Sequence, residues 1–328
     1  MKASLQRSRK PADRVLWLNR PFKNARLNSS CSATPTTFPV EDSSRVLRHL
    51  EFTKPLSFEK GIRIQENFVR AQLDMKHLQS KIDRKLNQLE TEHPGTTINQ
   101  HEQWILKNIT DMKPHPIALT FEFEPTYTGG KRSKKAVTLE DIARFENFVP
   151  QQQHHANQKR PKFVQVERGG QVTFHGPGQV VAYLILDLKS FNKFPAKCLV
   201  SAIEDSTISA LNKIPDGNRK APLGIEASKA TETGVWINEQ EKIASIGIHV
   251  RRSITSHGVC INVDPDLSYM NSFVMCGLQG TRATSIREQQ PESNCTTHDV
   301  AVGFVNELAK KLGITTVERI QLDDIELD

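Results

Sequence analysis

The clearest pattern of hydrophobic and polar positions lies in residues 57–91. Five apolar residues recur there at helical spacing, and charged residues fill the positions between them. They are Met75, Leu78, Ile82, Leu86 and Leu89. The segment His93-Pro94-Gly95 follows and carries the residues that end helices. The pattern predicts one long amphipathic helix, whose very polar far end we expect to project from the protein body.

The middle of the chain has the alternation and the short apolar runs that are typical of β-strands. Leu119, Phe121 and Phe123 alternate with Thr120 and Glu122, which predicts a strand with one apolar and one polar face. Further runs predict strands at 163–167, 172–174, 180–188, 234–238, 242–250 and 257–263, and helices at 196–214 and 297–312. Helices that bracket a mainly β middle predict one α+β domain over about residues 50–325.

Composition and charge limit the classes of protein. The chain has 328 residues, of which 37% are hydrophobic and 25% charged, and these values exclude a low-complexity protein. It contains no run of 18 apolar residues, so we expect no membrane span. The net charge of +7 resides in residues 1–40, which hold eight basic residues and one acid, so the remainder is neutral. We therefore expect no nucleic-acid partner.

Residues 1–40 have the composition of a targeting segment. They are basic, nearly free of acids and rich in serine, and they lack the long apolar stretch of a secretory signal. This pattern favours a mitochondrial presequence, disordered or removed by cleavage. A basic tail that binds a partner is the alternative.

The chain offers little that would bind a metal. The pair His154-His155 lies in a polar segment without a third ligand nearby in sequence, which favours a solvated loop. The five cysteines form neither a CxxC motif nor a Cys/His zinc spacing. We therefore predict no metal site.

Residues 168–179, RGGQVTFHGPGQ, contain four glycines in twelve positions beside predicted strands. The segment is neither a Walker loop nor a dinucleotide-binding fingerprint. Glycines allow backbone to approach a ligand closely, and they equally suit a tight hairpin, so both interpretations stay open.

Two reactive side chains stand out farther along the chain. Lys242 opens a predicted strand, where a lysine is commonly a solvated edge charge. Cys276 lies among glycines in the segment VMCGLQG, where it is either buried packing or a catalytic group on a loop.

Four motifs in this order resemble the octanoyltransferase family (lipoyl(octanoyl) transferase, also lipoate-protein ligase B), in its mitochondrial branch. The motifs are 168–179, KIASIG at 242–247, HGVCINV at 257–263, and Cys276-Gly277 through Thr284-Ser285. The resemblance covers about residues 115–312. The departures are Phe174 for a tyrosine, Cys260 for a small residue, Met275 for a proline, and apparent polar insertions at about 76–103 and 129–162.

The resemblance implies a fold, a reaction and partners. The fold is a mixed or antiparallel β-sheet flanked by helices, similar to the biotin/lipoate protein ligase catalytic module. The reaction moves octanoyl from acyl carrier protein to a lysine of lipoyl domains, the first step of endogenous protein lipoylation, without ATP or a metal. The lipoyl domains are those of 2-oxoacid dehydrogenase E2 subunits and of the glycine cleavage H protein, in the mitochondrial matrix.

The resemblance also implies roles for individual residues. Cys276 is the acyl-thioester nucleophile, and Lys242 lowers its pKa and moves protons. The substrate-binding residues are Arg168, Gly169, Gly170, Gln171, Val172, Thr173, Phe174, His175, Ser245, Ile246, Gly247, Gly258, Val259 and Cys260. We expect His175 to shape the pocket, with a general base as the alternative.

Three other functions remain open. They are an ATP-dependent lipoate-protein ligase, a non-catalytic protein that binds lipoyl domains or acyl carriers, and a cysteine protease, for which no flanking signature is present. Basic clusters at 131–135 and 159–162 could dock an acidic carrier, but ordinary solvated charge is the favoured interpretation of both. Arg251-Arg252, which follows the Lys242 strand, is the favoured docking candidate.

Overall fold

A computed structural model describes residues 37–93, 98–150, 159–215, 221–273 and 280–323 of the chain. Its main element is an eight-stranded sheet with the path β10-β8-β9-β6-β2-β1-β11 and with β7 paired to β8. The strands are β1 (Val46–Phe52), β2 (Ile117–Phe121), β6 (Gln179–Ile185), β7 (Val235–Trp236), β8 (Glu241–Arg251), β9 (Ile254–Asn262), β10 (Arg282–Ala283) and β11 (Thr316–Leu322).

The sheet is mixed, as predicted. Strand β1 is parallel to both β2 and β11, and β10 is parallel to β8, whereas β2, β6, β9 and β8 form an antiparallel series. The parallel partners are far apart in sequence: Val46 of β1 is aligned with Thr316 of β11. The antiparallel series forms the centre of the sheet and contains the predicted motif strands.

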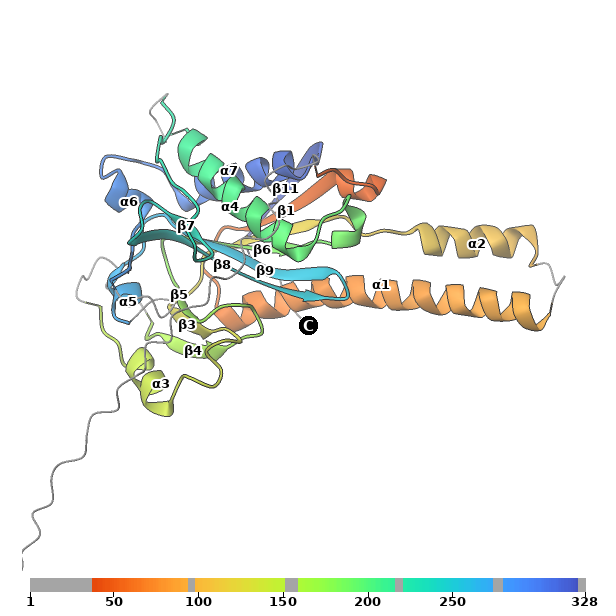
Figure 1. Cartoon of the computed structure of the whole chain (residues 1–328), viewed down its shortest axis with the longest axis horizontal. Helices are drawn as coiled ribbons and strands as arrows, with labels where there is room; N and C mark the ends of the chain where they lie inside the picture. The colour runs from red at the N-terminus through yellow and green to blue at the C-terminus, as the bar shows by residue number, and fades with distance from the viewer. Residues whose placement is uncertain (1–36, 94–97, 151–158, 216–220, 274–279, 324–328) are drawn as a thin grey trace, which may run out of the picture. The chain divides into compact units, whose positions relative to one another are not determined.

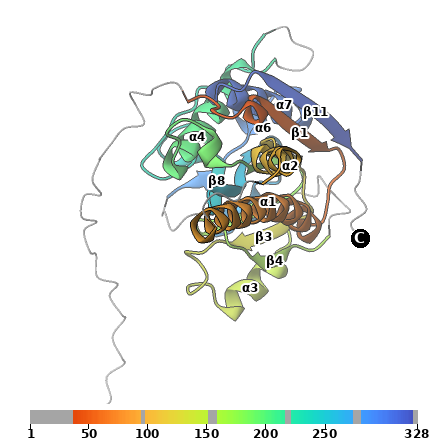
Figure 2. The ribbon, with the colours of Figure 1, turned by 90° about the vertical axis from the view of Figure 1, so that its right-hand side faces the viewer.

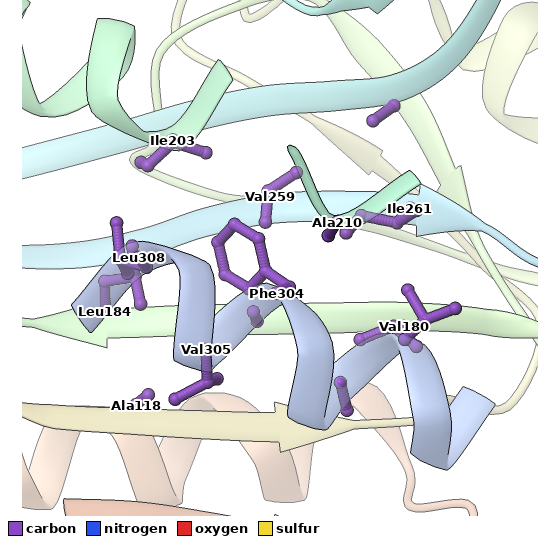
Figure 3. Close-up of a cluster of buried hydrophobic side chains, with 14 of the residues drawn as sticks. Ala118, Val180, Leu184, Ile203, Ala210, Val259, Ile261, Phe304, Val305 and Leu308 are labelled. Carbon is purple, nitrogen blue, oxygen red and sulfur yellow. The ribbon is translucent and has the colours of Figure 1, made fainter. Parts of the chain in front are cut away.

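Helices cover both faces of this sheet (Figures 1 and 2). On one face lie α4 (Ala196–Lys213) and α7 (Thr297–Lys311), both predicted from the sequence. Figure 3 shows Phe304 and Leu308 of α7 packing toward Val259 of β9 and Leu184 of β6. On the other face lies α1 (Phe58–Glu92), which begins at the cap residue Ser57 and buries its first turns.

Cover on both faces explains one wrong prediction. All five residues of β2 are buried, although Thr120 was expected on a polar face. Ala118 packs in the cluster under α4 and α7, while Leu119 belongs to the cluster under α1. Thr120 is accommodated because its hydroxyl is 2.8 Å from Nε2 of His49 on the neighbouring strand.

A smaller sheet has the order β4-β3-β5. Its strands are β3 (Thr126–Gly129), β4 (Lys162–Gln165) and β5 (Val172–His175). Helix α3 (Leu139–Glu146) covers it through Phe145, whose ring stacks on Tyr127 at 4.6 Å. The short elements are η1 (Asp42–Arg45), η2 (Leu188–Ser190), α5 (Ser268–Asn271) and α6 (Ile286–Gln289).

The far half of α1 extends beyond the sheet, as expected, and α2 (Gln100–Asp111) lies alongside it (Figure 1). Helix α2 was not predicted: it buries no residue, so it has no apolar stripe that faces a core. Local capping defines its start, because Asn99 and Glu102 form a capping box. Among the described residues, none of the helices combines the length and the apolar character needed to span a membrane.

Candidate active site

A cavity of about 650 Å³, its open mouth included, lies between the loop 168–171 and the strands β5, β6, β8 and β9. The structure brings most of the predicted substrate-binding residues to it, together with Lys242. The predicted residues that line it are Arg168, Gly170, Gln171, Val172, Thr173, His175, Lys242, Ser245, Ile246, Gly247, Gly258, Val259 and Cys260. Three motifs that are widely separated in sequence therefore form one site.

Two predicted residues do not line this cavity. The Phe174 ring stacks on Tyr269 at 4.4 Å and contacts Tyr127 edge-on at 5.1 Å, so it packs on the other side of β5. Gly169 donates its N–H to the carbonyl of Ile248 at 3.1 Å and supports the wall. Cys276, the predicted nucleophile, and the pair His154-His155 lie outside the described residues.

Lys242 is almost completely buried, with 3% of its surface exposed, at the start of β8. Its ammonium donates a hydrogen bond to the carbonyl of Thr233 at 2.9 Å and lies 5.0 Å from the centroid of the Trp236 ring. A cation over an aromatic face is attracted by the ring quadrupole. The lysine is therefore a fixed interior charge, which excludes the interpretation of a solvated strand-edge residue.

The segment that follows the predicted nucleophile in sequence returns beside this lysine. Ala283 of β10 is aligned with Lys242 in the parallel pair of β10 and β8, and the N–H of Thr284 donates to the Lys242 carbonyl at 3.0 Å. Thr284 in turn accepts a hydrogen bond at its own carbonyl from the Asn262 amide at 2.8 Å. The last motif is thus joined directly to two of the others.

Arg168 builds the cavity wall through its own guanidinium. That group donates to the carbonyls of Gly169 and Gln171 at 3.0 Å each, and to the carbonyl and hydroxyl of Thr128 at 2.8 Å each. A glycine on the facing strand β8 permits close packing against this loop, since a Cβ on Gly247 would lie only 2.8 Å from the Gly169 carbonyl oxygen. The segment borders the cavity, and the alternative of a tight hairpin is wrong, because β4 and β5 both pair with β3 and not with each other.

The side-chain amides of Gln179 and Asn262 hold the end of the segment 168–179 in place through hydrogen bonds. Gln179 accepts a hydrogen bond from the Gly176 N–H at 2.8 Å and donates one to Asn262 at 2.8 Å. Asn262 also holds the Thr284 carbonyl, as described above. These polar residues connect β6 and β9 with the residue that follows β10. Gln179 and Asn262 do not line the cavity.

Two buried histidines line the cavity in their neutral form. Burial lowers the pKa of His175 to about 3, and the Arg168 charge acts in the same direction. Burial likewise lowers the pKa of His257 to about 3. His175 stacks on Phe58 at 5.6 Å, which agrees with a role in shaping the pocket. A base with so low a pKa holds protons poorly near neutral pH.

Several lining residues were not predicted. They are Phe58, Arg132, Val181, Tyr183, Glu232, Thr233 and His257. Val181 and Tyr183 are two residues apart on a buried strand and therefore share one face of it. This spacing was the signal in the sequence from which their place in the cavity wall could have been predicted. His257 opens a motif that was itself recognised. Phe58 carried no signal, because it begins a helix, α1, and lies 110 residues before Arg168 in the sequence.

His257 has an unusual backbone. Its φ of +59° is left-handed, which is uncommon for a residue other than glycine. Its N–H donates to the buried side chain of Gln65 in α1 at 2.6 Å. Helix α1 therefore supplies both Phe58 and the support of His257 to the cavity. Within the described part of the chain, no group of three His, Cys, Asp or Glu side chains is arranged to hold a metal.

Residues 98–309 match the family model of the lipoyl protein ligase A/B catalytic domain. The chain is 60% identical over 310 residues to a mitochondrial octanoyltransferase of Kluyveromyces lactis, with 93% of each chain covered. It is 58% identical to a mitochondrial octanoyltransferase of Saccharomyces cerevisiae, with 89% of each covered. It is 34% identical to a mitochondrial octanoyl-[acyl-carrier-protein]:protein N-octanoyltransferase of Danio rerio, over 58% of this chain and 74% of that protein.

Proposed function

Since the chain belongs to the mitochondrial branch of the octanoyltransferase family, we propose that it works through an acyl-enzyme thioester on Cys276, with Lys242 as its proton carrier. The activity itself is the transfer of octanoyl from octanoyl-acyl carrier protein to protein, and the compartment is the mitochondrion. The observation that carries the proposal is the buried ammonium of Lys242 in the wall of a cavity formed by three motifs.

The first step transfers the acyl group to the enzyme. The Cys276 thiolate attacks the carbonyl carbon of the octanoyl thioester, a carbon–sulfur bond forms, and the bond to the carrier's pantetheine sulfur breaks. The departing sulfur takes a proton from the Lys242 ammonium. An ordinary thiol is only about a few per cent ionised at pH 7. The proposal therefore assigns to the Lys242 ammonium the role of favouring the thiolate form of Cys276.

The second step transfers the acyl group to the acceptor. A neutral lysine amine of a lipoyl domain attacks the Cys276 thioester, a carbon–nitrogen bond forms, and the Cys276 thiolate leaves. The nitrogen gives its excess proton to Lys242, which was left neutral by the first step. The ammonium and the thiolate are then restored for the next cycle, so the reaction needs neither ATP nor a metal.

The remaining assignments follow from the same family. We propose that residues 50–325 form the catalytic domain and that residues 1–40 are a presequence. We propose lipoyl domains of 2-oxoacid dehydrogenase E2 subunits and the glycine cleavage H protein as acceptors, in the matrix. The non-catalytic alternative has no support in the site, because a binding protein gains nothing from a desolvated ammonium beside its pocket.

Intact-protein mass spectrometry tests the acyl-enzyme. After exposure to octanoyl-carrier, the native chain should gain one octanoyl group that hydroxylamine removes, whereas Cys276→Ser should gain none that hydroxylamine removes readily. Cys295, a buried cysteine that does not line the cavity, provides the control, and Cys295→Ala should be acylated normally. Acylation that requires ATP and Mg²⁺ would instead favour a ligase.

A separate measurement tests Lys242. The pH dependence of Cys276 alkylation should move to higher pH by about one unit in Lys242→Ala, because the thiolate loses its neighbouring cation. Lys229 is the matched control. It pairs with Asp205 of α4 at 2.6 Å and does not line the cavity. An unchanged profile in Lys242→Ala would remove the proposed role.

A further inference from the structure

Arg132 is a charged residue of the cavity that the transfer chemistry does not use. It lies in the turn that follows β3, its side chain is exposed, and it lines the same cavity as Lys242. Its neighbours in the turn are engaged elsewhere, since Lys131 and Lys134 lie 3.4 and 3.9 Å from the Glu167 carboxylate. Among the residues that the structure describes, Arg132 forms no ion pair, so its guanidinium remains available to a ligand.

The turn is fixed against the cavity wall. The N–H of Arg132 donates to the Gly170 carbonyl at 3.1 Å, and the N–H of Lys131 donates to the Arg168 carbonyl at 2.9 Å. Within the turn, the buried hydroxyl of Ser133 donates to the Gly130 carbonyl at 2.9 Å. The base of the Arg132 side chain is therefore held at a defined place beside the glycine-rich loop.

Several of the other basic candidates already pair with carboxylates. Arg251, expected to dock the carrier, donates to both carboxylate oxygens of Glu66 at 2.8 Å. Lys159 lies 2.6 Å from Glu124, and Lys162 lies 3.3 Å from Glu59. The pair with Glu66 engages Arg251, whereas Arg252 is exposed, so the expectation that Arg251-Arg252 docks the carrier stays a prediction. Of the basic residues in these candidate clusters, Arg132 lines the cavity.

The donor substrate carries a matching anion. Its octanoyl thioester is held on a phosphopantetheine arm, whose phosphodiester lies at the end away from the sulfur. When the thioester reaches the cavity, the arm must leave through the mouth. Guanidinium groups bind phosphate oxygens with directed, charge-assisted hydrogen bonds. Glu232 lines the cavity from the loop before β7, and its charge would direct the phosphate away from that side.

We propose that Arg132 binds the phosphodiester of the phosphopantetheine arm at the mouth of the cavity. This inference rests on the proposed function and adds the binding site for the polar end of the donor arm. It predicts that the enzyme distinguishes a phosphorylated pantetheine from an unphosphorylated one, and that this distinction depends on a single side chain.

The test uses the full chain and two small competitors, S-octyl-4′-phosphopantetheine and S-octyl-pantetheine, in which a thioether replaces the thioester so that neither can donate an acyl group. Each is added to the transfer reaction from octanoyl-carrier to a lipoyl domain, and its apparent inhibition constant is measured. In the native chain the phosphorylated compound should compete about 5- to 10-fold better, as expected for a partly solvated charge-assisted contact. Arg132→Gln should bring the two constants together, and Arg132→Lys should restore part of the difference.

Lys135→Gln is the matched control, since Lys135 is an exposed base of the same turn that does not line the cavity. It should keep the native ratio of the two constants. Equal constants in the native chain, or a native ratio in Arg132→Gln, would overturn the proposal. Failure of Cys276 to acylate in the mass measurement would instead overturn the proposed function, so the two results are separable.

Discussion

Gly234 and Lys242 are packed so closely that position 234 has no room for a side chain. A Cβ on Gly234 would overlap Cε of Lys242 and would lie 3.0 Å from its ammonium nitrogen and 2.7 Å from the Ala244 carbonyl. The φ of Gly234 is +137°, a conformation that glycine alone adopts readily. Its N–H donates to the Glu204 carboxylate of α4 at 3.1 Å, which fixes this glycine against the helix.

Gly234→Ala should therefore displace the Lys242 side chain. We expect the acylation of Cys276 at neutral pH to slow by about tenfold, equivalent to about 1.4 kcal/mol, and its alkylation profile to move toward higher pH. Gly224→Ala is the control, because Gly224 also has a positive φ, of +64°, but its nearest Cβ contact would be 3.7 Å away. A folded Gly234→Ala protein with the native profile would contradict this positioning role.

We expect Cys260 to affect the choice of acyl chain. It lines the cavity and is 4% exposed, and burial raises the pKa of its thiol, so it acts as an apolar wall group. Cys260→Ala enlarges the cavity, and we expect decanoyl-carrier to gain about threefold over octanoyl-carrier, roughly the value of one buried methylene. Competition between the two donors measures this ratio.

The same ratio of decanoyl to octanoyl transfer distinguishes the effect of Cys260 from that of Phe174, another departure from the family pattern. Phe174 does not line the cavity, so Phe174→Tyr should keep the native preference between the two acyl chains. A shift in Phe174→Tyr of the size expected for Cys260→Ala would show that packing behind β5, rather than the wall itself, sets chain selectivity.

Gln65 supports the strained backbone of His257. Gln65→Ala would leave a buried N–H without its acceptor, and such a loss costs about 1–3 kcal/mol. We expect a lower free energy of unfolding by that amount in urea denaturation. Gln88→Ala on the same helix is the control, because Gln88 is exposed and its amide bonds to the exposed side chains of Lys85 and Glu92, so its loss should change stability by under about 0.5 kcal/mol.

The neutral histidines make stability depend on pH. The pKa of His257 is about 3 in the folded chain and 6.5 as an unperturbed group, so below pH 6.5 the unfolded chain binds the additional proton. The associated stability is complete above pH 6.5 and is lost as pH falls toward 3, at about 1.4 kcal/mol per unit. Asparagine tolerates a left-handed backbone, so His257→Asn should fold.

Chemical denaturation at pH 6 and at pH 4 checks this expectation. Between those values the native chain should lose more stability than His257→Asn, because the variant lacks one group that protonates on unfolding. His175, with a folded pKa of about 3 for the same reason, should leave a residual dependence in the variant. Identical slopes in the two proteins would show that His257 is not desolvated in the folded chain.

The sequence by itself determined the helices α1, α4 and α7, the central strands, the family and most of the cavity. Each of these leaves a local signature: an apolar period of 3.6 or 2 residues, or a motif of adjacent residues. Lys242 was identified in this way, as a member of a motif. Its burial was not, because a lysine at the start of a strand looks the same in sequence whether it faces solvent or Trp236.

Only the tertiary structure decided which distant segments meet. The parallel pairing of β1 with β11, the place of Phe58 in the cavity wall, and the closeness of Gly234 to Lys242 all depend on contacts between elements. The hydrophobic pattern along one segment predicts that a face of the segment is buried, but it does not predict which other element covers that face. For the same reason Arg251 looked free in the sequence and is paired with Glu66 in the fold.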